Sequence, residues 1–201
     1  MTKIGIIIGS IRKKSESARI GAFVEKLLTD MDAGVTPEVF SLRDIELPFW
    51  SEDRWQADSG LNTLWKTQSD RLKTCNGFVV ISPEWAGMAP PHLKNFLLMC
   101  DGGELAHKPA QLVSISSGTG GAYPVAELRM SGYKNNFLWW MPDHMILRHV
   151  ATLFQVDPPT ELDVTLEVRL KYSLAFLVET AAAVTPVREK LQNLALYKFG
   201  M

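Results

Sequence analysis

Short apolar runs alternate with amphipathic stripes along the first part of the chain. Residues 3–8 form a continuous apolar run, which is typical of a strand that is covered on both faces. A stripe with helical spacing follows, in which apolar side chains recur every three or four residues. Gly34 is expected to end this helix, and residues 36–42 predict a second strand. The stripe consists of Ile20, Phe23, Val24, Leu27, Leu28 and Met31.

The same alternation continues through the middle of the chain. A polar loop leads to a predicted helix over residues 60–74, and residues 77–82 predict a buried strand that ends at Pro83. The proline pair at 90–91 favours the start of another helix, because the first N–H groups of a helix need no partner within it. The glycine pair at 102–103 is expected to close that helix.

Two further strands are expected, over residues 111–116 and 144–150. A glycine-rich turn and a helix that reaches about residue 131 lie between them. Strands that alternate with helices at this spacing favour a mainly parallel sheet with helices on both faces, since each parallel connection needs a crossover. The sequence therefore predicts an α/β fold.

Residues 162–170 are ambiguous, since apolar and polar positions alternate there as in a strand. Their continuation, KYSLAFLVETAAAV, is rich in good helix formers and too long for an ordinary strand. We predict one helix over residues 163–183, with a short helix and tail in residues 184–201. Residues 1–201 are expected to form one domain, because a chain of this length can bury enough surface for a single core.

Three unusual turns follow predicted strands, at the edge where parallel sheets bind ligands. The first reads GSIRKKSES. The Arg12 guanidinium and several hydroxyls can donate to phosphate oxygens there, and the next helix presents free N–H groups. The turn matches neither the Walker A pattern nor Gly-x-Gly-x-x-Gly, which disfavours a nucleoside triphosphate. Capping of the helix by serine is the alternative. The hydroxyls belong to Ser10, Ser15 and Ser17.

The second and third turns are rich in small residues. In SPEWAGMAPPHLKNFL, glycine and alanine leave the backbone open to the edge of a flat heterocycle, and Trp85 supplies an aromatic wall. The alternative is a proline-punctuated connection with Trp85 in the peripheral core. In SISSGTGGA, three glycines with Ser116, Ser117 and Thr119 offer backbone amides at a helix start. A flexible surface loop is the alternative there.

Taken together, the three turns resemble the NADPH-dependent FMN reductase family, over about residues 3–131. This family includes quinone, azo-dye and chromate reductases. The resemblance implies a flavodoxin-like three-layer sandwich with a five-stranded parallel sheet in the order 2-1-3-4-5. It also implies bound FMN, NADPH or NADH as co-substrate, and hydride transfer from the nicotinamide through FMN to a small-molecule acceptor. Quinones, azo compounds, metal oxyanions and free flavin are the acceptor classes.

The family motifs assign roles to particular residues. Gly-Ser-x-Arg-x-x-Ser holds the FMN phosphate in the family, which implies that role for Ser10, Arg12, Ser15 and Ser17. Pro-Glu-Tyr-Asn-x-x-x-Pro-x-x-Leu-Lys-Asn lines the flavin ring, which implies that role for Pro83, Glu84, Trp85, Ala86, Gly87 and Met88. The opposite flank of the ring is assigned to Ser117, Gly118, Thr119, Gly120 and Gly121. No side chain is assigned to catalysis, since the cofactor carries the chemistry.

The chain also departs from the family pattern. Trp85 replaces the usual tyrosine, Ala86 the usual asparagine, and Leu98 an acidic residue that often follows Leu-Lys-Asn. LPFWSED resembles the family's Leu-Pro-x-x-x-x-Asp loop. Lys13, Lys14 and Arg19 could meet the extra phosphate of NADPH, although solvated charges are the simpler interpretation. They belong to the first turn and the helix that follows it.

Composition narrows the classes of partner. Lys and Arg number 21 against 22 Asp and Glu, so no global basic field argues for nucleic acid or an anionic membrane surface. The first apolar run is too short for a signal peptide core or a membrane span, so a cytoplasmic location is expected. Cys75 and Cys100 are expected to be buried and unpaired. The four histidines have no metal-ligand spacing, so no metal site is assigned.

Tryptophans are abundant around the loops. Core packing is the simpler interpretation, and an oligomer interface is the more specific one. Family members are commonly dimers or tetramers, so at least a homodimer is expected. The alternative function is a flavodoxin-like electron-transfer or interaction module with no NAD(P)H turnover of its own. The near-neutral charge does not favour an electron carrier, which would need an acidic docking face. The tryptophans in question are Trp50, Trp55, Trp65, Trp139 and Trp140.

Overall fold

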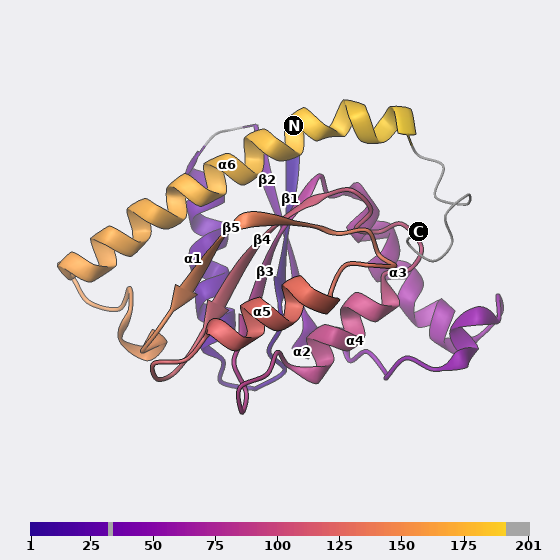
Figure 1. The fold of residues 1–201 in the computed structure, drawn as a ribbon, viewed down its shortest axis with the longest axis horizontal. Coiled ribbons are helices and arrows are strands. Elements are labelled where there is room, and N and C mark those ends of the chain that lie inside the picture. Colours follow the sequence, from indigo (N-terminus) through magenta and orange to yellow (C-terminus); the bar gives the residue numbers. More distant parts are fainter. Residues whose placement is uncertain (32–33, 192–201) are drawn as a thin grey trace.

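Five parallel strands form the centre of the computed structural model, which describes residues 1–31 and 34–191 (Figure 1). The strand order is β2-β1-β3-β4-β5, and every neighbouring pair is parallel, which confirms the expected flavodoxin-like sheet. The strands are β1 (Thr2–Ile8), β2 (Val35–Ser41), β3 (Gly77–Pro83), β4 (Pro109–Ile115) and β5 (Trp139–Leu147).

Helices cover both faces of this sheet and complete the three layers. One face packs against α1 (Glu16–Met31) and α6 (Glu161–Leu191), and the other against α3 (Gly60–Thr74), α4 (Pro91–Met99) and α5 (Ala122–Ser131). The short helices are α2 (Leu42–Ile45), η1 (Glu52–Trp55) and η2 (Val150–Thr152).

Consecutive residues of β1 show how the sheet separates two cores. Ile6 and Ile8 pack on the side of α1 and α6, whereas Ile7 packs on the other side with Phe78 and Phe96. All five side chains are buried. Because β1 lies between two helix layers, both of its faces favour apolar residues, which explains the continuous apolar run in the sequence.

The fifth strand begins earlier than the sequence predicted. It starts at Trp139 rather than at residue 144, and it ends at Leu147. The apolar run there ends at Pro142 and Asp143, which do not favour a strand, and β5 is an edge strand on which Trp139 is 47% exposed. An edge strand can also contain Pro142, which has no N–H to donate to a ladder.

Helix α6 is longer than predicted, and the expected break after residue 183 was wrong. One helix runs from Glu161 to Leu191 and contains Pro186 in its last turns. Packing of Leu177 and Ala181 against the sheet holds the helix in line up to the proline, which overrides the local cost of the missing N–H. The expected tail, residues 192–201, lies outside the described residues.

Two other expectations concern single side chains and membrane segments. Cys75 and Cys100 are both buried and free, as expected, and burial raises the pKa of the Cys75 thiol to about 11. Trp65 is a core residue, while Trp55 is 75% exposed. Within residues 1–31 and 34–191, no helix is apolar enough over a sufficient length to cross a membrane.

Candidate functional site

The three turns singled out in the sequence meet at the carboxyl edge of the sheet. They follow β1, β3 and β4, which are neighbours, and Figure 1 shows their loops at one end of the sheet. At that edge, a backbone hydrogen bond links the start of each of the first two turns to the end of the next strand in the sheet. Gly9 N–H donates to Ile81 O at 2.9 Å, and Glu84 N–H donates to Ile115 O at 3.0 Å. The expectation that these stretches converge is therefore confirmed.

The first turn, residues 9–15, depends on the close approach of Gly9 to β3. A Cβ atom at Gly9 would lie 2.8 Å from Ile81 O and 3.1 Å from a methyl of Leu93. The contact with Ile81 O is shorter than Cβ atoms adopt and involves backbone, so a side chain here would force the turn or the strand to move. The glycine thus lets the chain leave β1 tightly packed against the end of β3 and the start of α4.

The serines of the first turn have different environments. Ser15 Oγ accepts a hydrogen bond from Ala18 N–H at 3.4 Å, so the capping interpretation is confirmed for Ser15. Ser10 is buried, and its Oγ accepts from Arg12 N–H at 3.3 Å. Ser17 is buried in the first turn of α1. The Arg12 guanidinium is exposed and has no hydrogen-bond or ion-pair partner among the residues that the structure describes.

Arg19 is not a solvated charge, because its guanidinium is hydrogen-bonded within the chain. Its guanidinium donates to Leu153 O at 2.9 Å and Val150 O at 2.5 Å, and its Nε donates to Glu16 at 2.7 Å. The interpretation as a solvated charge was therefore wrong for this residue. Arg19 fastens the start of α1 to the segment after β5, which sequence spacing does not reveal.

The second turn is a tight reversal after β3. Trp85 N–H donates to Met88 O at 3.0 Å, and Met88 N–H donates to Trp85 O at the same distance. The two central residues are left-handed, with φ of 51° at Ala86 and 75° at Gly87. Their N–H groups have no partner within the described part of the chain, so two backbone donors remain open at this tip.

Glu84 connects the second turn to the third. Its carboxylate accepts a hydrogen bond from Gly121 N–H, at the start of α5. A Cβ atom at Gly120 would lie 2.7 Å from one carboxylate oxygen, so glycine is needed for this approach. Gly121 itself is left-handed, with φ of 102°. One side chain thus sets the separation of two turns that come from neighbouring strands.

The third turn, residues 116–121, is held by bonds to the segment after β5. Arg148 Nε donates to Thr119 O at 2.7 Å and to Gly120 O at 3.1 Å. His149 N–H donates to Gly118 O at 2.9 Å. These bonds argue against the alternative of a loose surface loop. Arg148 was missed in the sequence because nothing in its local context indicates which backbone it meets.

Asn95, the last residue of the Leu-Lys-Asn motif, has a structural role that the motif does not indicate. Its amide donates to Pro48 O at 2.8 Å and accepts from Trp50 N–H at 2.7 Å. The side chain is 7% exposed. These bonds hold the LPFW loop beside the first turn, where a cavity of about 260 Å³ lies between Ile11, α2 and the start of α4.

Two exposed aromatic residues near these turns were also missed. Tyr123 is 69% exposed at the start of α5, and a Cβ atom at Gly87 would lie 3.7 Å from its ring. Phe49 is 65% exposed, and its ring lies 5.6 Å from the imidazole of His92. A large apolar side chain that stays exposed beside open backbone is the signal that could have identified Tyr123.

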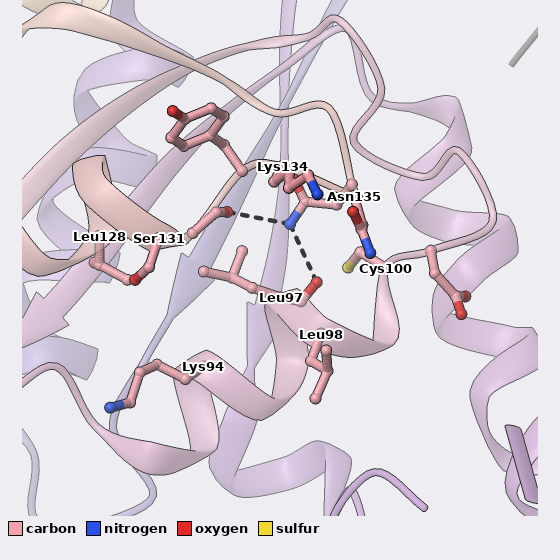
Figure 2. Close-up of a pocket in the computed structure, with 12 residues that line it drawn as sticks. Lys94, Leu97, Leu98, Cys100, Leu128, Ser131, Lys134 and Asn135 are labelled. Carbon is pink, nitrogen blue, oxygen red and sulfur yellow. Dashed lines mark hydrogen bonds between the residues drawn. The ribbon is translucent and has the colours of Figure 1, made fainter. Parts of the chain in front are cut away.

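A cavity of about 410 Å³ lies away from the turns, between α4, α5 and the loop that follows α5 (Figure 2). Leu97, Leu98 and Leu128 contribute apolar surface. Asn136 closes one side, since its amide donates to Leu97 O and Gly132 O at 3.1 Å each. Leu98, one of the departures from the family pattern, therefore lies here and not at the turns.

Solved structures with the same fold include three NAD(P)H- or NADH-dependent reductases. FerB, a flavoenzyme NAD(P)H:(acceptor) oxidoreductase from Paracoccus denitrificans, has a TM-score of 0.70 and 22% identity, covering 91% of this chain and 98% of its own. An NAD(P)H:quinone oxidoreductase from Methanothermobacter marburgensis has a TM-score of 0.61 and 16% identity, covering 86% and 96%. An FMN-dependent NADH-azoreductase from Bacillus anthracis, solved with FMN, has a TM-score of 0.56 and 15% identity, covering 89% and 100%.

No curated protein matches the chain. The family model for NADPH-dependent FMN reductase matches residues 2–152, which include all three turns and Arg148. Three quarters of the chain is thus covered, including the whole sheet, and α6 lies beyond the match. The chain belongs to the NADPH-dependent FMN reductase family.

Proposed function

We propose that the three turns at the carboxyl edge bind FMN, and that the chain passes reducing equivalents from NAD(P)H to a small-molecule acceptor. Membership of an FMN reductase family establishes the cofactor class. The observation that supports the placement is the meeting of the three turns at one edge, with unpartnered polar groups on the first two among the described residues.

The first turn fits the phosphate end of FMN. Arg12 is an exposed cation without a partner among the described residues, beside the N-terminus of α1, where free N–H groups favour an anion. Ser10 and Ser17 would hold the phosphate with Arg12. Ser15 already caps the helix through its Oγ, and the same hydroxyl remains able to donate to a phosphate oxygen.

The second and third turns fit the ring. The open N–H groups of Ala86 and Gly87 are donors for the polar edge of a flat heterocycle, and Trp85 is half-buried next to them. Replacement of the family's asparagine by Ala86 removes a side-chain amide but leaves these backbone donors. Residues 83–88 would line one side of the ring and residues 117–121 the other, at the separation that Glu84 sets.

FMN, when bound, supplies a ring that accepts a hydride and releases electrons to a second substrate. The residues of this chain bind the cofactor, orient it and limit access to it. Exposed Tyr123 and Met88 stand at the rim, beside the left-handed turn, where they would contact the nicotinamide or the acceptor. No side chain is assigned to proton transfer.

The acceptor is proposed to be a quinone, an azo compound, a metal oxyanion or free flavin. Two of the structural neighbours are described as quinone and azo reductases. The protein is proposed to act as a homodimer or homotetramer, since Trp55 and Trp139 are exposed and aromatic residues are enriched at interfaces. Light scattering tests this, and a monomer would contradict it. A single domain and a cytoplasmic location stay predictions.

Arg12→Ala tests the phosphate assignment. Loss of a charge-assisted contact should weaken FMN binding by about 1.5–3 kcal/mol, which is roughly a 10- to 150-fold rise in Kd measured by quenching of flavin fluorescence. Lys14→Ala is the matched control, because it removes an exposed cation from the same turn. An unchanged Kd for Arg12→Ala would remove the assignment.

Acceptor-dependent oxidation of NADPH separates an enzyme from an electron carrier. The FMN-loaded protein is expected to oxidise NADPH at a rate that depends on added quinone, azo dye or free FMN. A protein that binds FMN but shows no such oxidation would be the electron-transfer module of the alternative interpretation.

A further inference from the structure

A basic cavity lies at the amino edge of the sheet, at the opposite end from the three turns. Its volume is about 380 Å³, which is within the range of small-molecule sites. Four basic side chains line it, from the end of α3, the start of β4 and the end of α6. They are Lys73, His107, Lys108 and Arg188.

Helix α6 brings Arg188 to this edge by passing over the start of the strands (Figure 1). A Cβ atom at Gly77 would lie 3.1 Å from the Cβ of Ala181, which shows how closely the helix crosses β3. Asn76, just before β3, then donates to Thr185 Oγ1 at 3.2 Å. Arg188 lies one turn further on. The cavity therefore exists only because the helix continues through Pro186.

The Arg188 guanidinium has no partner in residues 1–31 and 34–191, and its Nε is buried. Burial lowers the pKa of this group, and only the neighbouring Glu189 opposes that effect. A guanidinium carries donors in a planar fork that matches the oxygens of phosphate or sulfate. A buried donor without an acceptor is costly, so this atom is one that a bound anion would satisfy.

Lys108 forms the floor of the cavity and is 1% exposed. Its Nζ donates to Leu72 O at 2.8 Å, Lys73 O at 3.2 Å and Glu104 O at 2.7 Å. These acceptors are carbonyls, and none is a carboxylate. Burial, followed by the nearby charge of Arg188, lowers the Lys108 pKa to about 7.

The Glu104 carboxylate, whose charge acts on Lys108, is hydrogen-bonded to other groups. Glu104 accepts from Trp65 Nε1 at 3.0 Å, Ser69 Oγ at 2.6 Å and Gly102 N–H at 2.8 Å. The ammonium of Lys73 and the ring of His107 make no hydrogen bond within the described part of the chain. The cavity thus gathers basic groups with no acidic partner inside it.

We propose that this cavity binds a small dianion, such as sulfate, inorganic phosphate or the phosphate group of a phosphomonoester. Like charges held together in a partly buried site repel, and an anion between them turns that repulsion into attraction. The site is separate from the three turns, because the seven residues of β4 extend about 20 Å between the two edges. It does not depend on the proposed flavin site.

Isothermal titration of sulfate into the full chain tests this proposal. Sulfate keeps two charges across the useful pH range, and saturating FMN is present so that the first turn cannot bind the probe. One saturable site per chain is expected. Arg188→Gln should weaken sulfate at least about tenfold, because it removes a charge-assisted contact. Lys73→Gln should also lower the affinity for sulfate.

Lys190→Gln is the matched control, since it removes an exposed charge two residues from Arg188 that does not line the cavity. Sulfate affinity should be unchanged in this variant. The absence of saturable binding would overturn the proposal, and so would equal weakening by Lys190→Gln and Arg188→Gln. Lys73 is exposed and its replacement leaves the core intact, so Lys73→Gln keeps the test decisive if Arg188→Gln fails to fold.

Discussion

The two edges of the sheet differ in the hydrogen-bond partners and burial of their polar groups. At the carboxyl edge, the turns leave the Arg12 guanidinium and the N–H groups of Ala86 and Gly87 without partners among the described residues. At the amino edge, Lys108 is buried and donates to three carbonyls that α3 and its neighbours leave free. The carboxyl edge presents open donors to solvent, whereas the amino edge encloses the Lys108 ammonium beside an Arg188 guanidinium that has no partner among the described residues.

This difference follows from the direction of the strands. In a parallel sheet all connections leave at one end and return at the other. The leaving segments begin helices, whose first N–H groups are open, while the returning segments follow helices, whose last carbonyls need donors. Lys108 supplies such donors to the end of α3, at Leu72 and Lys73. The chemistry of each edge is therefore set by which helix terminus faces it.

The largest effect should come from breaking the close packing at the carboxyl edge. Gly9→Ala places a Cβ 2.8 Å from Ile81 O, so the first turn must move away from β3. The free energy of unfolding, measured by denaturant titration, should fall by about 2–3 kcal/mol. Gly60→Ala is the control, because a Cβ there meets nothing within 4 Å.

Gly60 is the first residue of α3, where alanine should raise the free energy of unfolding by about 0.5 kcal/mol. Opposite signs for Gly9→Ala and Gly60→Ala would show that contact with β3, and not the loss of glycine as such, is responsible. A Gly9→Ala protein as stable as the unaltered chain would contradict the packing at this edge.

A pH titration examines the amino edge. Lys108 has a pKa of about 7 in the folded chain, lowered mainly by burial, against an ordinary value of 10.5. Between these values the unfolded chain holds a proton that the folded chain lacks, so stability should rise as the pH increases. The slope should reach up to about 1.4 kcal/mol per pH unit between about pH 7 and 9.

Lys108→Met removes the titrating group and should flatten this slope. Sulfate should flatten it too if the cavity binds the anion, because a bound dianion favours the charged lysine. Unfolding is followed by denaturant titration at each pH. An equal slope in Lys108→Met and the unaltered chain would show that another group controls the dependence.

The smallest effect is expected at the tip of the second turn. Ala86 has a φ of 51°, a left-handed conformation that costs a residue with a Cβ about 1–2 kcal/mol. Ala86→Gly should therefore raise the free energy of unfolding by about 1 kcal/mol. Ala86→Asn should give a smaller rise, since asparagine tolerates this region. A loss of stability in both variants would contradict the left-handed turn.

Most of the fold was accessible from the sequence because central strands and helix stripes leave strong patterns. β1 and β3 are buried on both faces, and their apolar runs identified them within a residue or two. The start of β5 was missed because Pro142 and Asp143 interrupt its apolar run, and only an edge strand tolerates that proline. The end of α6 was missed because Pro186 is a strong local signal, which the packing of Ala181 and its neighbours overrides.

The candidate site was accessible only in part. Serines, glycines and Arg12 stand directly after strands, so local spacing and topology were enough to place them at one edge. Arg19, Arg148 and Lys108 each donate to a backbone carbonyl far away in the sequence, and no local pattern encodes those bonds. A fully buried lysine such as Lys108 is also rare, so the sequence analysis had no reason to single it out.

The bond between Glu84 and Gly121 N–H has a consequence for access. This hydrogen bond joins the second turn to the third, which restricts the movement of either turn relative to the other. Tyr123, 69% exposed at the start of α5, stands beside these turns. Selection among electron acceptors would then depend on the shape of a preformed site, with little rearrangement of these two turns on binding.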